Sequence, residues 1–268
     1  MRKIVLMLVV YLLVGSNLWA KESYFNPYEP EPKKVVKKRV VEKKSQPKRA
    51  KKPLIKKSVK VTKVKKREVK KGKKRTKKLN RRLSKKIDQI YKKVLKKTNI
   101  SRVALKRAFS YYKKNRYKKS LSSKYLAIAD YTKTARSKRL YIINLKNGAV
   151  YRHKVAHGKG SGGIGGKVRR SSNRRHTNMT PYGFFKVGSR VGRTKKKGYR
   201  YLSVKGLQSS NRKVGYPSRM GGRDVVVHPA KYVNSGGRSH GCFAICPNDR
   251  YRVFSKLKKA LLYSYTGR

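Results

Sequence analysis

A histidine and a cysteine near the C-terminus form the group of residues in this chain best suited to chemistry. His228 ends the apolar run 225–227, and Cys242 follows fourteen residues later, directly after Gly241. Cysteine attacks a carbonyl carbon as the thiolate, and a histidine within reach can accept the thiol proton. The spacing therefore predicts a nucleophile and its base, with backbone N–H groups around Gly241 and Cys242 as candidates for holding an oxyanion.

The same residues also have ordinary structural explanations. An isolated cysteine is usually a small buried apolar residue, and an isolated histidine is usually structural. Cys246 is the second of the two cysteines, and a disulfide between it and Cys242 would silence the nucleophile. A zinc site that adds His228 and His240 to both cysteines is a further alternative, although its spacing fits no standard zinc finger. We favour a free, partly buried Cys246 thiol.

Carboxylates are scarce in the part of the chain that carries these residues. From residue 101 onward there is no Glu, and the Asp residues are Asp130, Asp224 and Asp249. This scarcity argues against a hydrolase with paired carboxylates and against a two-metal site for phosphoryl transfer. The chemistry is therefore expected at the cysteine.

The chain of 268 residues is strongly basic, with 78 Lys and Arg against 9 Asp and Glu and a formal net charge of +69. Such an imbalance implies an anionic partner: nucleic acid, anionic lipid or an acidic wall polymer. The 19 tyrosines are weak evidence for nucleic acid, because most fall inside strand candidates where sheet packing explains them.

The first residues predict export to the periplasm or cell wall. A basic start, the apolar run 4–14 and the small residue Ala20 are typical of a secretory signal over residues 1–20. The run is shorter than the roughly 20 residues that span a bilayer. Retention as an uncleaved anchor is the alternative, because Leu18 is not the small residue that cleavage prefers.

Beyond the signal, three further regions are expected. Residues 21–80 are rich in Lys and Arg and lack an apolar stripe, which predicts a disordered basic tail. This tail is either an electrostatic tether to an anionic envelope polymer or membrane surface, or a solvated spacer. Residues 81–124 show apolar residues at helical spacing and form a helical entrance segment, with Ser101 as the N-cap of its second helix.

Residues 125–268 are expected to be mainly β. The strand candidates cover residues 125–131, 139–145, 149–156, 184–191, 199–206, 224–228 and 261–266. Asn147-Gly148 predicts a type I′ hairpin turn, and a helix is expected to start near Asn248. Many short strands with few helices indicate a β-sandwich or barrel with flanking helices.

The segment Ser239-His240-Gly241-Cys242 fits a Ser-x-Gly-Cys signature that follows a strand-end histidine. In this it resembles the L,D-transpeptidase (YkuD-like) catalytic domain, and most closely the murein L,D-transpeptidase branch. The likeness covers roughly residues 100–266. It continues in the stretches 125–130, 139–148, 155–162, 180–184 and 226–230.

The resemblance implies a role for each residue of the signature. Cys242 would be the nucleophile and His228 the general base, while His240 and Gly241 would shape the oxyanion pocket. The group that orients the histidine is often a backbone carbonyl in this family, and Pro229 leaves only a main-chain group at that position. The residues expected to contact substrate are Ser239, Arg238, His157, Gly158 and Gly183.

Two positions depart from the pattern of many relatives. Ala244 stands where they carry Arg or Asn, and Pro229 stands where they carry Gly. Both departures bear on how a substrate carboxylate is recognised more than on the attack itself.

The implied reaction is acyl transfer on peptidoglycan stem peptides. The cysteine would attack the carbonyl at the L-centre of diaminopimelate, release D-Ala and pass the thioester to an amine. A histidine–thiolate pair needs no metal or other cofactor. Two alternatives stay open: an L,D-carboxypeptidase that uses the same site with water, and a non-enzymatic cationic protein that binds wall or nucleic acid.

Overall fold

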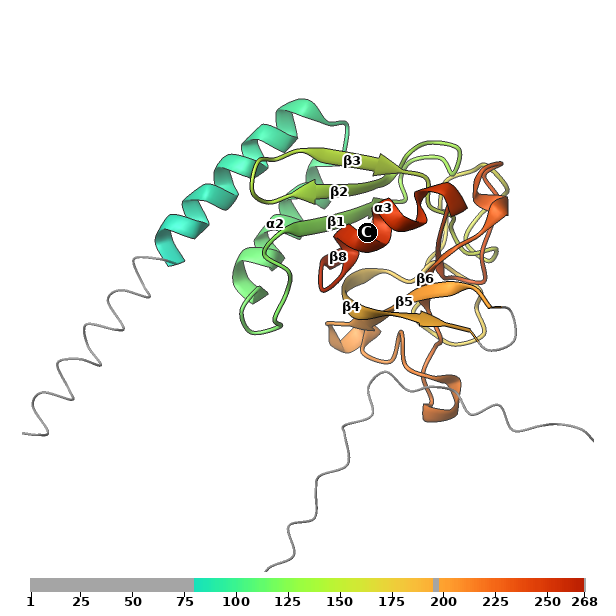
Figure 1. The fold of residues 1–268 in the computed structure, drawn as a ribbon. Coiled ribbons are helices and arrows are strands. Elements are labelled where there is room, and N and C mark those ends of the chain that lie inside the picture. Colours follow the sequence, from blue (N-terminus) through green and yellow to red (C-terminus); the bar gives the residue numbers. More distant parts are fainter. Residues whose placement is uncertain (1–79, 195–197, 268) are drawn as a thin grey trace, which may run out of the picture. The chain divides into compact units, whose positions relative to one another are not determined.

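Eight strands form one mixed sheet in the computed structural model, which describes residues 80–194 and 198–267 (Figure 1). The order across the sheet is β3-β2-β1-β8-β4-β5-β6-β7. The strands are β1 (Tyr125–Asp130), β2 (Leu140–Asn144), β3 (Val150–His153), β4 (Gly183–Arg193), β5 (Arg200–Gly206), β6 (Val226–Pro229), β7 (Phe243–Ile245) and β8 (Leu261–Tyr265). The sequence had indicated all of these except β7, which has only three residues.

The sheet almost closes on itself. Val155, just after β3 at one edge, forms an antiparallel bridge with Ile245 of β7 at the other edge. The amide of Ala156 also donates to the carbonyl of Ala244 at 2.9 Å. The prediction of a mainly β, barrel-like domain with flanking helices is confirmed.

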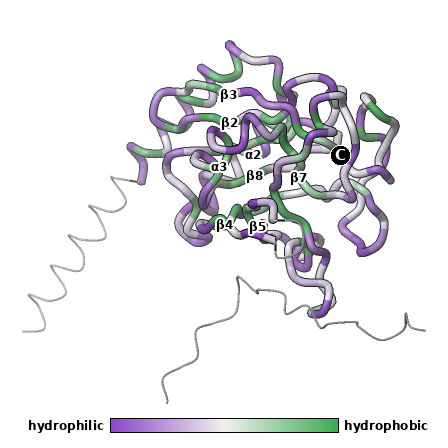
Figure 2. Tube along the Cα trace, turned by 45° about the vertical axis from the view of Figure 1, so that its right-hand side comes forward, coloured by the Kyte–Doolittle hydropathy of each residue, from purple (hydrophilic) through white to green (hydrophobic). Residues whose placement is uncertain are grey.

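Both faces of the sheet are buried, which explains why the strands read as apolar runs. Leu126 and Ile128 of β1 pack into one hydrophobic cluster, while Ala127 and Ala129 pack into the other. This alternation follows from the two-residue period of a strand. Figure 2 shows hydrophobic positions concentrated along the strands and hydrophilic ones in the loops.

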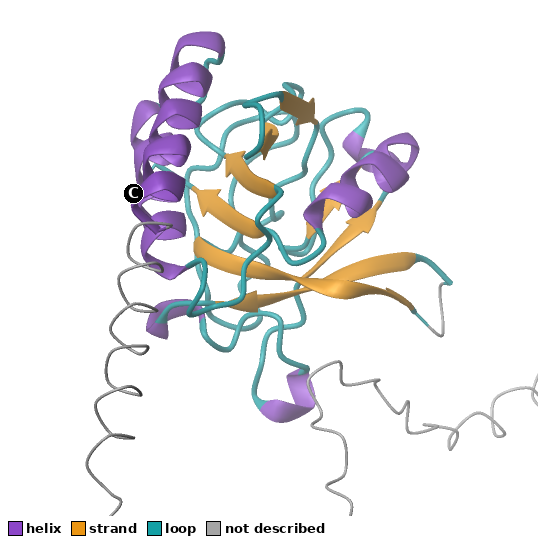
Figure 3. Ribbon diagram, turned by 60° about the vertical axis from the view of Figure 1, so that its left-hand side comes forward, coloured by secondary structure: helices purple, strands orange, loops and turns teal. Residues whose placement is uncertain are grey.

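Helices cover the two faces from opposite sides (Figure 3). The helix over residues 80–97 and α2 (Arg102–Asn115) contribute to the cluster of Leu126, and α3 (Arg250–Leu257) contributes to the cluster of Ala127. The Ser101 hydroxyl caps α2 by accepting from the Ala104 amide at 3.5 Å. The helices of residues 81–124 thus share a hydrophobic core with the sheet.

The turn between β2 and β3 differs from the prediction. The two strands form an antiparallel hairpin, with Ile143 opposite Val150. A type I′ turn needs positive φ at both central residues, but of Asn147 and Gly148 only the glycine has it, with φ 76°. The Gly148 amide donates to the Asn144 carbonyl at 2.8 Å and closes a longer loop.

The predicted signal at residues 1–20 lies outside the described residues, and so does the basic tail over residues 21–79. Within the described part of the chain, no helix is long and apolar enough to cross a membrane.

Candidate active site

His228 lies on β6, and Cys242 directly precedes the neighbouring parallel strand β7. In the pairing of β6 with β7, His228 lies opposite Ala244 and Val227 opposite Phe243. Cys242 comes one residue before Phe243 and lies outside the paired strand. Its thiol lies near the amide of Val226, two residues before His228 on β6.

The backbone fixes the proton of His228 on Nδ1. This nitrogen lies 3.1 Å from the Pro229 carbonyl oxygen, which can only accept a hydrogen bond. Nδ1 is therefore the donor, and Nε2 keeps its lone pair. Burial lowers the pKa of His228 below its ordinary value, which keeps the imidazole neutral at neutral pH. The ring of Tyr199 lies beside it, with the ring centres 5.2 Å apart.

The thiol of Cys242 is partly exposed and free. Its Sγ donates a weak hydrogen bond to the Asp224 carbonyl at 3.8 Å. Burial raises the pKa of the Cys242 thiol, while the Val226 amide and the positive charge of Arg223 pull this pKa down. Both shifts favour a neutral thiol and a neutral imidazole at neutral pH.

Arg223 is the cation beside Cys242, and its residue type alone does not distinguish it among 78 Lys and Arg. Its side chain is 7 % exposed, and its guanidinium donates to the carbonyls of Ser172 and Met179. Burial lowers the pKa of Arg223, and the charge of Cys242 opposes this shift. Arg238 is predicted to contact substrate, and His240 is predicted to shape the oxyanion pocket. Both side chains are exposed, and Arg238 donates to loop carbonyls, including that of Gly162 at 3.3 Å.

The turn before Cys242 is held by Ser239, which is 2 % exposed. Its hydroxyl donates to the Cys242 carbonyl at 2.8 Å and accepts from the Gly241 amide at 3.0 Å. Gly241 has a φ of +113°, which favours glycine. Ser239 was expected to contact substrate, but its burial and these bonds make it a residue that shapes the turn.

His157 is buried and binds the backbone of the turn that precedes Cys242. Its carbonyl accepts from the Ser239 amide at 2.8 Å, and its side chain is fully buried. The guanidinium of Arg139 donates to Nδ1 of His157 at 3.0 Å and to the Val155 carbonyl at 3.0 Å. The predicted contact of His157 with substrate is therefore wrong for this structure, because its imidazole is enclosed in the core.

The two glycines expected near substrate are packed against other backbone. The Gly158 amide donates to the Thr180 hydroxyl at 3.0 Å, and Gly158 pairs with Ser239 in a short parallel bridge. Gly183 opens β4 with a φ of +101° and lies against the side chains of Gln208 and Asn211.

A polar pocket of about 420 Å³ lies next to this framework. Arg223 connects the two, because Ser172, whose carbonyl it binds, belongs to the pocket wall. The lining residues are Ser171, Ser172, Asn173, Arg174, Tyr182, Ser209, Ser210, Asn211, Arg212, Lys213 and Val214. The pocket is a candidate binding cleft with a polar and basic lining.

Residues 96–265 match the family model described as L,D-transpeptidase catalytic domain. This match covers more than half of the chain. The chain belongs to the L,D-transpeptidase catalytic domain family. Membership links it to transpeptidase chemistry.

A crystal structure of an L,D-transpeptidase from Xylanimonas cellulosilytica is similar to this L,D-transpeptidase domain at 16 % sequence identity and a TM-score of 0.30. The similarity covers 54 % of this chain and 61 % of that one, so the chain spans less than two thirds of the neighbour's length. No curated protein matches the chain.

Neither a disulfide between Cys242 and Cys246 nor a zinc site is supported by the described part of this L,D-transpeptidase domain. Cys242 and Cys246 are both free thiols. Across residues 80–194 and 198–267, no group of three or more His, Cys, Asp or Glu side chains is placed to hold a metal ion. Cys246 instead packs beside a small apolar cluster that contains Ala156 and Val233.

Proposed function

We propose that this protein is an exported cysteine L,D-transpeptidase that acts on peptidoglycan stem peptides. The observation that carries the proposal is that Cys242 directly precedes β7, beside the parallel strand β6 that carries His228, and that the Pro229 carbonyl accepts the Nδ1 proton of His228. This leaves Nε2 as the proton acceptor for a thiol. Family membership supports the same reaction class.

In the proposed reaction, Nε2 of His228 accepts the thiol proton while Sγ of Cys242 attacks the carbonyl at the L-centre of diaminopimelate. The Gly241 amide is engaged by Ser239, so the Cys242 amide is the backbone donor that we assign to the developing oxyanion. The intermediate collapses when the imidazolium protonates the leaving D-Ala amine, and a thioester results. An acceptor amine then loses a proton to His228, attacks the thioester and restores the thiol.

Mass spectrometry of the intact protein after incubation with a tetrapeptide muropeptide tests this proposal. We expect a covalent adduct on Cys242 and one released D-Ala for each adduct. Cys246→Ser is the matched control and should form the adduct, whereas Cys242→Ser should not. An adduct that persists in Cys242→Ser, or no adduct with unmodified protein, would overturn the assignment.

The second half of the reaction identifies the acceptor. When an amine such as a second stem peptide is added, the thioester should pass to it and give a cross-linked product. Release of the free tripeptide as the main product would instead mean that water is the acceptor, as in an L,D-carboxypeptidase.

Export and wall association are supported by sequence alone. The apolar run 4–14 supports a cleaved signal, and the charge of residues 21–80 supports attraction to an anionic envelope surface. We expect the mature protein in the envelope fraction with an N-terminus after Ala20. An N-terminus at Met1 in a soluble cell extract would contradict this part of the proposal.

A further inference from the structure

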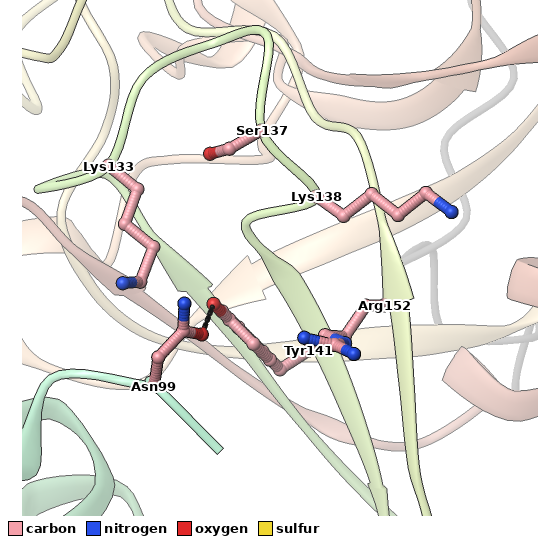
Figure 4. A pocket seen from close by; sticks show the side chains of 6 residues that line it. All are labelled: Asn99, Lys133, Ser137, Lys138, Tyr141 and Arg152. Atoms are coloured by element: carbon pink, nitrogen blue, oxygen red, sulfur yellow. Dashed lines mark hydrogen bonds between the residues drawn. The ribbon is translucent and has the colours of Figure 1, made fainter.

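A hollow of about 560 Å³ lies away from the cysteine, where the ends of β2 and β3 meet two loops (Figure 4). Its lining residues are Asn99, Lys133, Ser137, Lys138, Tyr141 and Arg152. Three of these are cationic and none is acidic. The ion pairs within the described residues join Lys113 to Asp88 and His153 to Asp249, so none of them neutralises this hollow.

One wall of the hollow is built in a fixed geometry. Tyr141 is 1 % exposed, and its hydroxyl donates to Oδ1 of Asn99 at 2.8 Å. Burial raises the pKa of Tyr141 to about 12, so the hydroxyl keeps its proton and stays a donor. The amide nitrogen of Asn99 therefore faces away from Tyr141 with its N–H groups available. Figure 4 shows this nitrogen on the same wall as the ammonium group of Lys133.

Asp130 forms no ion pair with the described cationic side chains that line this hollow. Asp130 influences Tyr141 electrostatically, but it is fully buried. Its Oδ2 accepts from the Ser101 amide at 2.9 Å, and its Oδ1 accepts from the Thr132 hydroxyl at 2.6 Å. Asp130 is thus used to join the start of α2 to the end of β1.

A second hollow of about 380 Å³ adjoins the first and shares Arg152 with it. It adds Lys93 and Lys97 from the helix over residues 80–97, and its lining is also free of acidic residues. Five cationic side chains therefore follow one continuous surface. A ligand with one charged group would neutralise the cations of only one of the two hollows.

We propose that the first hollow binds a phosphate group, and that the two hollows together bind successive phosphates of a phosphate-bearing polymer. Phosphate fits because its oxygens point in several directions and can accept from ammonium, guanidinium and amide donors such as those that line this hollow. A carboxylate has two oxygens in one plane, which a single arginine fork can satisfy. The site shares no lining residue with the polar pocket beside Arg223, and it is independent of the proposed reaction.

The test is lysine footprinting of the full-length protein, with acetylation at each lysine read by mass spectrometry. At a phosphate concentration about three times the Kd, acetylation of Lys133 and Lys138 should fall roughly fourfold. Lys118 and Lys119 are exposed, lie outside both hollows and serve as internal controls. Because each lysine is read separately, binding of phosphate to the basic tail does not obscure the result. Equal protection of the control lysines would overturn the proposal.

Variants of the protein and other ligands test which side chains and which anion account for the protection. Arg152→Gln should abolish protection of Lys133, whereas Arg190→Gln, which removes an exposed arginine on β4, should not. Citrate at the same charge should protect less than phosphate does. Polyphosphate should extend protection to Lys93 and Lys97. If polyphosphate fails to protect Lys93 and Lys97, a phosphate-bearing polymer is not the ligand. The same conclusion follows if vesicles of phosphatidylglycerol protect these lysines and polyphosphate does not.

Discussion

The guanidinium of Arg223 lies against the Cα of Gly241, the residue before Cys242. A side chain at position 241 would collide with Nη2 of Arg223, so this contact requires glycine there as much as the φ of +113° does. The same guanidinium holds the carbonyls of Ser172 and Met179. Arg223 thus joins three chain segments beside Cys242 and is also the positive charge that favours the thiolate of Cys242.

Arg223→Met should raise the pKa of the Cys242 thiol, because the thiolate loses its nearby positive charge. The rate of alkylation by iodoacetamide, followed as a function of pH, measures this pKa directly. We expect the midpoint of the profile to move to higher pH and acyl-enzyme formation at neutral pH to slow. The two carbonyls left without a donor should cost about 1–3 kcal/mol of unfolding free energy.

Arg223→Lys separates the effect of the positive charge at position 223 from the effect of the hydrogen bonds that its side chain donates. Lysine keeps the positive charge but lacks the planar fork that reaches two carbonyls. The thiol pKa should therefore return toward that of the unmodified protein, while stability stays reduced. Identical alkylation profiles for Arg223→Met and the unmodified protein would show that Arg223 does not act on the thiol.

Ser239→Ala should slow acylation more than it weakens substrate binding. The substitution leaves the Gly241 amide without its acceptor and releases the Cys242 carbonyl, so the nucleophile loses its fixed position. A displacement of about 1 Å can reduce a rate roughly 100-fold. Steady-state kinetics should show a fall in kcat with little change in KM. Ser235→Ala, an exposed residue that precedes the same turn, is the control. A change confined to KM would restore Ser239 as a substrate contact.

The pH profile of acyl-enzyme formation should be broad. The pKa of His228 lies below its ordinary 6.5 because of burial, and the pKa of Cys242 lies above its ordinary 9.0 for the same reason. Between these two values the thiol is protonated and the imidazole can accept its proton. The rate of acyl-enzyme formation should therefore be the same at pH 6.5 as at neutral pH and should decline only at lower pH. A decline centred above pH 6.5 would contradict a buried, neutral base.

Much of the architecture follows from local patterns, whereas the support of the site does not. The strand pattern of residues 125–131 predicts β1, and Ser101 predicts the start of α2, because periodicity and capping are local properties. The likeness of the Ser239–Cys242 segment to a known family indicates where the nucleophile lies. None of these signals depends on which distant segments meet.

His157 and Arg223 owe their roles to contacts across the fold, whereas Ser239 acts within its own turn. His157 receives a hydrogen bond from Arg139, and Ser239 binds the backbone at both ends of its own turn. Arg223 is one arginine in a chain of net charge +69, so its type alone gives no signal. Its importance comes from burial beside Cys242, which only the three-dimensional structure reveals. The Asn147-Gly148 turn was misjudged because loop length, set by the β2–β3 register, outweighs dipeptide preference.

The buried His157 should make the protein less stable in mild acid. Burial and the charge of Arg139 lower the pKa of His157 below its ordinary 6.5, so the unfolded chain binds a proton that the folded chain resists. Stability is therefore full above pH 6.5, and it falls with pH from there down to the folded-state pKa. Burial lowers the pKa of Arg139 to about 10, which still leaves it charged throughout this range.

Denaturant unfolding at several pH values measures this effect. His157→Gln keeps an acceptor for Arg139 but cannot titrate, so its stability should depend less on pH between 7 and 5 than that of the unmodified protein. His176→Gln, at an exposed loop position, is the control. Equal pH dependence in all three proteins would remove His157 as the cause.

Leu105→Ala tests whether the helices before β1 belong to the same folding unit as the active site. Leu105 of α2 is fully buried in the cluster that contains Leu126 and Ile128 of β1. Truncation of a buried leucine should cost about 2–5 kcal/mol, and the loss should appear in one cooperative transition. Val103→Ala, on the same helix but 47 % exposed, should change stability by less than about 0.5 kcal/mol. If α2 were an independent entrance segment, Leu105→Ala would melt a helical signal alone while alkylation of Cys242 kept its native denaturant midpoint. We expect both signals to shift together, because β1 is covered by α2 and lies in the sheet that carries the nucleophile.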